Sequence, residues 1–223
     1  MKFSAVFKPT SLFSLKSSNA TNSGAKSLFL PSPYSIKMAI LNQAITVGGE
    51  LEKLTAKKNK EFGFIRDTKI EYYLPKESFF TINNSFVKIL KPARSGDGFQ
   101  QTVAFREYIH IDNNIELIFN VENEETKEYL KQFLYRINYF GKKGCFFQFI
   151  NYSDNPNEAN VKPFSTNDFV PGIIEEYDDF ASEVNFENVD NYSTKATKRK
   201  KLILTLPLDK FSSSKSYSCY KVI

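Results

Sequence analysis

The sequence contains few of the residues that build redox, metal or disulfide sites. Among its 223 residues there are two cysteines, Cys145 and Cys219, one histidine, His110, and no tryptophan. No CxxC pair and no Cys/His spacing typical of a zinc site is present. Nothing indicates a disulfide scaffold, which favours a reducing cytoplasm. We therefore expect a cytoplasmic protein with no metal and no cofactor.

Long apolar segments are also missing. No apolar run approaches the roughly 20 residues that a membrane-spanning helix needs. Lys8 and Pro9 interrupt the apolar start of the chain, which makes that start too short and too polar for a signal peptide. We expect no membrane partner.

What the chain does have is aromatic residues and positive charge. It contains 22 Phe and 12 Tyr, and its formal net charge is +5. A pI of about 9.0 suits a polyanionic partner such as RNA. The length suits one large domain that buries a substantial core.

The charge is distributed unevenly along the chain. Residues 1–60 hold nine Lys against Glu50 and Glu52, and residues 154–190 hold ten carboxylates against Lys162. A basic group follows at Lys195, Lys198, Arg199, Lys200 and Lys201. One interpretation is a set of solvated faces. The other is a basic side that meets RNA and an acidic side that meets a basic protein.

Alternating apolar residues predict several strands. Phe3, Ala5 and Phe7 alternate with polar residues, as in a half-buried strand. The stretch after Asn151 is acidic and is predicted to be a loop. Further strands are predicted over residues 70–73, 79–90, 101–111, 115–121, 145–149 and 202–206.

Two helices are predicted from apolar periodicity and end signals. Ser32 as N-cap and Pro33 in the first turn begin a helix over residues 33–47. Acidic residues begin a second helix over residues 124–139, and the glycines of residues 141–144 are expected to end it.

The order of these elements predicts an α+β fold. It matches a ferredoxin-like (RRM-like) βαββαβ core whose two crossover helices cover one face of the sheet. We assign residues 1–150 to this domain, with an inserted hairpin at about residues 79–111 that protrudes as a thumb. Residues 151–223 are assigned to an acidic loop and a β-rich C-terminal extension of the same domain.

Three segments carry a likeness to a known family. They are Pro31-Ser32-Pro33-Tyr34-Ser35-Ile36-Lys37, Arg106-Glu107-Tyr108-Ile109, and Ile137-Asn138-Tyr139-Phe140-Gly141-Lys142-Lys143-Gly144-Cys145-Phe146-Phe147-Gln148. In this order they resemble the CRISPR-associated Cas-five family of the RAMP superfamily, whose glycine loop is often Gly-Lys-Arg-Gly. Lys143 and Cys145 stand where that family often has Arg and Ser.

The resemblance implies a function. The family that it resembles consists of subunits that cap the 5′ handle of crRNA in type I Cascade surveillance complexes, which are ribonucleoproteins of antiviral defence. In those complexes the subunit lies beside the large subunit and the first backbone subunit. We therefore expect an RNA-binding subunit with these partners, linked to target DNA only through the complex, and not an enzyme. Two alternatives remain: a metal-free endoribonuclease that processes precursor crRNA, and a generic basic protein-interaction module.

The tip of the predicted hairpin is the first candidate RNA site. Its cations would meet phosphates and its ring would stack on a base, as in the recognition of single-stranded RNA. An exposed turn kept soluble by charge is the alternative. The candidate residues are Lys88, Lys91, Arg94, Phe99 and Gln101, followed by Arg106.

The glycine loop and the start of the first helix are the other candidates. Gly141 and Gly144 let the backbone approach a ligand closely, and Lys142 and Lys143 supply charge. The alternative for this loop is a helix C-cap with solvated lysines. The start of the first helix offers free N–H groups to phosphate. Lys37 lies near the first turn, where a cation is locally unfavourable, and its position there indicates a nearby anion. The residues concerned are Ser32, Ser35 and Lys37.

Catalytic and metal sites find little support. His110 shares a strand face with Tyr108 and Arg106, and histidine is the usual base in metal-free RNA cleavage, yet no partner constellation accompanies it. The carboxylate pairs Glu175-Glu176 and Asp178-Asp179 suit a solvated face or a protein contact better than a metal. We expect no catalytic residue and no metal ligand.

Overall fold

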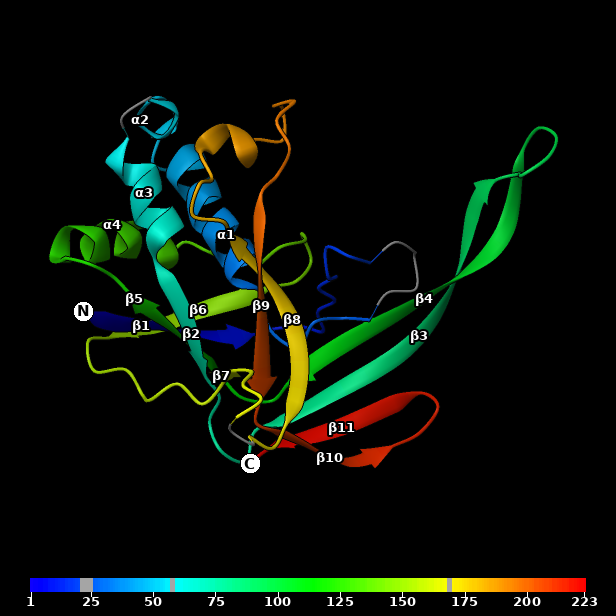
Figure 1. Ribbon diagram of the computed structural model, residues 1–223. Coiled ribbons are helices and arrows are strands. Elements are labelled where there is room, and N and C mark those ends of the chain that lie inside the picture. The colour runs from blue at the N-terminus through cyan, green and yellow to red at the C-terminus, as the bar shows by residue number, and fades with distance from the viewer. Residues whose placement is uncertain (21–25, 57–58, 168–169) are drawn as a thin grey trace.

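The protein folds into antiparallel sheets accompanied by a few helices (Figure 1). The computed structural model describes residues 1–20, 26–56, 59–167 and 170–223. The mixed α+β class predicted from the sequence is confirmed. No helix in the described part of the chain is long and apolar enough to cross a membrane.

The first sheet lies at the centre of the molecule. Its strands are β1 (Lys2–Pro9), β2 (Lys69–Tyr73), β5 (Ile115–Asn120) and β6 (Phe147–Ser153), in the spatial order β2-β5-β1-β6. All neighbouring pairs are antiparallel. Phe3, Ala5 and Phe7 of β1 are completely buried, as predicted, but Ser4 is completely buried as well, so the strand is not exposed on its other face there.

Helices pack against one side of this sheet (Figure 1). They are α1 (Pro33–Thr46), α2 (Leu51–Thr55), α3 (Lys60–Asp67) and α4 (Glu124–Leu134). Helices α1 and α4 are in contact, so the two predicted crossover helices share one face. The Ser32 side chain caps α1, as predicted, and Asn123 caps α4.

The predicted end of the second helix is wrong. Helix α4 ends at Leu134, where the backbone N–H of Ile137 donates to the Leu134 oxygen in a tighter turn. The chain then forms a bridge between Tyr139 and Phe146. Leaving the helix places Ile137 in the core, and the glycine loop becomes the tip of this narrow turn instead of a helix cap.

The second sheet contains a long hairpin. Strands β3 (Phe79–Pro92), β4 (Phe99–Ile111), β10 (Leu208–Ser213) and β11 (Tyr217–Val222) have the order β10-β11-β3-β4. Strand β11 pairs with β3 only from Phe79 to Asn83. Beyond Asn84, whose N–H donates to the Ser216 carbonyl, the two hairpin strands pair only with each other among the described residues, and they project away from the body as predicted (Figure 1).

The third sheet corrects the prediction of an acidic loop. Strands β7 (Lys162–Pro163), β8 (Ile173–Phe180) and β9 (Arg199–Leu206) have the order β7-β9-β8, and a 3-10 turn, η1 (Phe186–Asn188), follows β8. Acidic β8 lies opposite basic β9, with Asp178 facing Lys201 and Asp179 facing Lys200. Opposite charges therefore meet across strands, where each pair is favourable. For these two strands the pairing argues against the interpretation of a separate acidic side and basic side.

Candidate nucleic-acid interface

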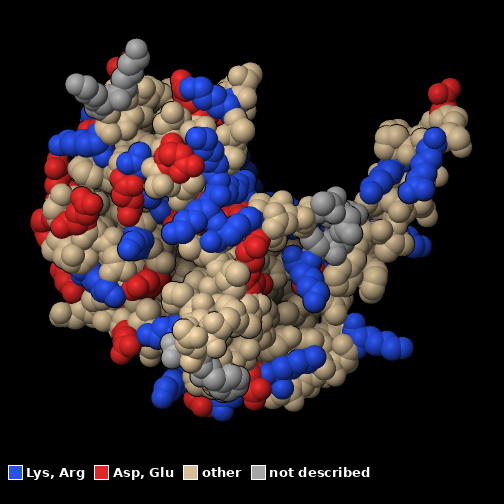
Figure 2. All heavy atoms as spheres, viewed as in Figure 1, with Lys and Arg blue, Asp and Glu red and all other residues tan. Residues whose placement is uncertain are grey.

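The outer half of the β3–β4 hairpin presents unpaired cations. Lys88, Lys91 and Arg94 are exposed, and no carboxylate of the described residues forms an ion pair with any of them. Arg106 is half-buried nearer the root of the hairpin. Figure 2 shows Lys and Arg side chains gathered on this outer half, away from the body. Such a surface attracts phosphate because no internal partner neutralises it.

One face of the hairpin is apolar. Directly opposite residues of antiparallel strands share a face, and Phe86 lies opposite Phe105 with ring centroids 5.4 Å apart. The same face holds exposed Phe99 and Leu90, which are 73% and 66% accessible. Other residues of this face are Lys88, Gln101 and Val103. Exposed rings between cations are the arrangement on which unpaired bases stack.

The sequence reasoning missed two of these rings. Phe86 and Phe105 were assigned to strands, but Phe86 was not recognised as exposed, nor Phe105 as partly exposed. A signal was available in the sequence, because apolar residues continue on both faces of the strand over Phe86-Val87-Lys88-Ile89-Leu90 in a hairpin that was predicted to protrude. Of the predicted residues, Lys91 and Arg106 lie on the opposite face, and Arg94 lies in the connecting loop.

The glycine loop lies beside the start of α1. Gly141 and Gly144 have φ angles of +66° and +100°. A Cβ atom at Gly141 would lie 3.1 Å from the Leu15 Cδ2 atom and 3.8 Å from the Ser35 Cβ atom, so a larger residue would be strained there on two counts. Lys142 and Lys143 point from this tight turn as exposed side chains. Two of the predicted segments, the loop and the helix start, are thus adjacent.

The hydroxyl groups at the start of α1 are already engaged. The Ser35 N–H donates to the Ser32 Oγ atom at 3.2 Å, and the Ser35 hydroxyl donates to the Ser32 carbonyl at 2.8 Å. Ser32 itself is buried. Of these two predicted ligands, only Ser35 is partly accessible, and it faces the glycine loop.

Lys37 is not part of an RNA interface. Its side chain is 2% exposed, and its Nζ atom lies 2.7 Å from the Asp179 Oδ1 atom and donates to the Arg66 carbonyl at 2.8 Å. Burial lowers the pKa of Lys37, and the Asp179 carboxylate opposes that shift. The cation near the helix start is therefore balanced by an internal carboxylate from β8, which the sequence did not indicate, and the predicted contact with RNA is wrong.

Comparison with known proteins adds to this geometry. No protein-family model matches the chain. CRISPR-associated protein Cas5 of Archaeoglobus fulgidus is 24% identical over 197 residues, which cover 83% of this chain and 82% of that protein. The chain is therefore similar to a Cas5 protein over most of its length. This confirms the family resemblance drawn from the three sequence segments.

A structural comparison gives a weaker likeness. One chain in the cryo-EM structure of the type III-B Cmr-beta bound to cognate target RNA and AMPPnP has a TM-score of 0.41 and is 10% identical. The similarity covers 98% of this chain and 86% of the other chain.

A segment between β1 and α1 joins the parts of the candidate interface. Phe13 forms a bridge with Ile109 at the root of the hairpin, and Thr10 N–H donates to the Phe146 carbonyl next to the glycine loop. Ser27 N–H donates to the buried Glu107 carboxylate of β4 at 2.9 Å. The hairpin root and the glycine loop are therefore connected to the same segment of the chain.

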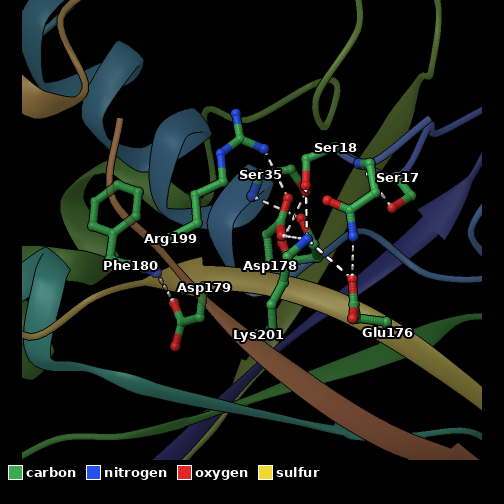
Figure 3. A network of polar contacts seen from close by, with 11 residues as sticks. Ser17, Ser18, Ser35, Glu176, Asp178, Asp179, Phe180, Arg199 and Lys201 are labelled. Atoms are coloured by element: carbon green, nitrogen blue, oxygen red, sulfur yellow. Dashed lines mark hydrogen bonds and ion pairs between the residues drawn. The ribbon is translucent and has the colours of Figure 1, made fainter. Parts of the chain in front are cut away.

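A polar network holds the same segment against the third sheet (Figure 3). Asn19 donates to Glu176 at 2.7 Å, and Lys201 donates to the Ser18 hydroxyl at 2.8 Å. Burial raises the pKa of Asp178, but hydrogen bonds from Lys201, Ser18 and Arg199 outweigh it and hold that pKa below its usual value. The acidic residues of β8 therefore act as internal anchors. Among the described residues, no cluster of His, Cys, Asp and Glu could hold a metal ion.

His110 stands apart from these contacts. It is exposed on β4, opposite Thr81, and no described residue forms a hydrogen bond or ion pair with its imidazole ring. Tyr108 lies on the same face two residues away. A general base is normally oriented by a second polar group, and none does so here in the part of the chain that the structure describes.

Proposed function

We propose that this chain is a Cas5-family subunit that binds crRNA and caps its 5′ handle in a type I Cascade complex. The observation that carries the proposal is the outer hairpin, where exposed rings alternate with cations that no described carboxylate pairs. The family resemblance supports crRNA as the particular RNA. A protruding, uncovered strand pair that displays apolar side chains to solvent is best explained by a partner that covers it.

We also propose that the body is a ferredoxin-like core. Two observations support this: the strand order β2-β5-β1-β6 with antiparallel neighbours, and two helices that follow β1 and β5 and share one face. That arrangement has the form of the split β-α-β pattern. The hairpin is then an insertion between β2 and β5, and strands β8 to β11 form the C-terminal extension.

The geometry suggests how the RNA would be held. Lys88, Lys91 and Arg94 contact phosphates along the hairpin, while bases splay onto Phe99 and neighbouring rings. Lys142 and Lys143 contact phosphates beside the body. The large and backbone subunits of the complex would contact surfaces outside this path. The proposal assigns no catalytic role to any residue, His110 included.

A binding and cleavage assay tests this function. The purified chain is incubated in EDTA with fluorescent repeat RNA, and affinity is measured by anisotropy at several salt concentrations. We expect binding without cleavage. Cleavage that His110→Ala abolishes would instead favour a metal-free endoribonuclease, and lack of affinity at low salt would favour a protein-interaction module.

A matched pair of double variants locates the site. Each phosphate contact to a single strand contributes about 0.7 to the slope of log affinity against log salt. Lys142→Ala with Lys143→Ala should therefore weaken binding and flatten the slope. The control is Lys53→Ala with Lys60→Ala on α2 and α3, which removes equal charge at two lysines whose side chains are each 62% exposed. Equal effects of the two pairs would exclude the glycine loop as a site.

A further inference from the structure

A cleft separates the free edge of β2 from the third sheet. Its volume is about 510 Å³, and strands β1, β2, β7 and β9 contribute to its walls. The floor is apolar and includes buried Tyr72, Val161 and Leu204. The proposed RNA path does not include this cleft, because no residue of the hairpin or the glycine loop lines it.

The apolar surface of the cleft extends onto its wall. Ile203 and Phe164 line it and are 49% and 43% exposed. They lie side by side, because the Phe164 N–H donates to the Ile203 carbonyl at 2.9 Å. Phe164 also lines a second hollow together with Ile174, which is 54% exposed. Apolar side chains therefore continue in a strip from one hollow to the next, as a bound segment of several residues would require.

Backbone groups of β2 face the same cleft. The Tyr72 carbonyl accepts from the Asn160 and Val161 N–H groups, and the Asn160 side chain bonds both backbone groups of Leu74. Alternate residues of a strand present their backbone groups to the same edge. Ile70 lies two residues before Tyr72, so its N–H and carbonyl also point away from β5. No described residue outside β2 and β5 forms a hydrogen bond with these two groups.

The rim of the cleft has an excess of unpaired positive charge. Lys2 pairs with Glu71 at 2.8 Å and Lys162 with Glu158 at 3.2 Å, so these carboxylates are neutralised. The Asp179 carboxylate is held by buried Lys37. The remaining lining lysines are Lys69, Lys200 and Lys201, of which only Lys201 pairs with a carboxylate among the described residues. Lys69 and Lys200 are exposed and free for an acidic partner.

We propose that this cleft binds an extended segment of another protein chain in which carboxylates alternate with apolar side chains. The open backbone groups of Ile70 on the β2 edge would bond its backbone, the strip from Ile203 to Ile174 would cover its apolar side chains, and Lys69 and Lys200 would pair with its carboxylates. A nucleic acid fits less well, because Phe164 is the one exposed ring among the described lining residues and Glu71 and Glu158 lie in the same wall. This docking site is independent of RNA binding.

A designed peptide probes the chemistry directly. The probe is a fluorescent eight-residue peptide of alternating leucine and glutamate, with its ends blocked. Two comparison peptides replace leucine with serine or glutamate with lysine. Anisotropy measures affinity, and amide chemical shifts of the full chain locate the contact. We expect only the leucine–glutamate peptide to bind, with shifts confined to the amides of β2, β7, β8 and β9.

Charge reversal provides the decisive variant. Lys69→Glu with Lys200→Glu should weaken peptide binding by at least about tenfold, because like charges would then face each other. The matched control is Lys76→Glu with Lys210→Glu, two exposed lysines that do not line the cleft. No binding up to about 1 mM, equal losses in both variants, or equal affinity for the serine peptide would overturn the proposal. So would displacement of the peptide by oligouridine, which would make the cleft a nucleic-acid site.

Discussion

Replacing Lys37 with methionine tests whether this lysine stabilises the fold or contacts RNA. Methionine keeps the length and apolar character of the side chain, but it leaves the Asp179 carboxylate without its partner 2.7 Å away and the Arg66 carbonyl without its donor. Lys37 is 2% exposed and the Asp179 side chain 15% exposed, so solvent screens the orphaned charge poorly. Removing one member of a buried ion pair costs about 3–5 kcal/mol.

That loss is large enough to measure by calorimetry. In a domain of this size each kcal/mol shifts the melting temperature by about 2–4 °C, so Lys37→Met should lower it by roughly 6–20 °C. Adding Asp179→Asn should restore most of the stability, because the uncompensated charge is removed. Lys142→Met, an exposed control, should leave the melting temperature within about 1 °C. A stable Lys37→Met variant with weakened RNA binding would refute the buried ion pair and restore the interpretation drawn from the sequence.

Four further outcomes are expected. Burial raises the pKa of Glu175 from 4.5 to about 7, so its contribution to stability is complete below about pH 4.5 and is lost as the pH rises through about 7; Glu175→Gln should flatten urea-denaturation profiles over that range. Phe99→Ala should weaken RNA binding by roughly 1–3 kcal/mol without changing the salt slope measured by anisotropy. His110→Ala should leave the amount of mature crRNA in the host unchanged, as judged by small-RNA sequencing. Amides of residues 85–106 should exchange with solvent faster than those of residues 79–83, because β11 covers β3 only as far as Asn83.

The sequence was most informative where local chemistry determines the structure. Alternation identified β1 and the hairpin strands, and the Ser32 cap located the start of α1 within one residue. These features depend on residues close in sequence, so a single chain is enough to reveal them. The end of α4 depended instead on tertiary packing, because burial of Ile137 and the Tyr139–Phe146 bridge draw the chain out of the helix.

Distant partners explain the larger errors. Strand β8 was predicted as a loop because four of its eight residues are carboxylates. Only the facing lysines and arginine of β9 make that composition compatible with a sheet. In the same way Lys37 looked like an exposed cation, since nothing near it in the sequence identifies Asp179 as its partner. The charge pattern of the sequence thus predicted that the charged residues have partners of opposite charge. It did not show that those partners lie in the same chain.

Ion pairing within the chain also determines which positive charges are left to attract a polyanion. Residues 173–206 hold five cations and seven carboxylates, so the rest of the chain has a formal charge of +7 although the whole chain has +5. Residues 85–106 of the hairpin hold four cations against the single carboxylate Asp97. They project from the body (Figure 1), and among the described residues no carboxylate forms an ion pair with these cations. The basic run of β9, which is the densest in the sequence, is partly neutralised by β8, whereas the sparser cations of the hairpin are free. The electrostatic attraction for RNA should therefore depend on the hairpin more than on the most basic stretch of the sequence.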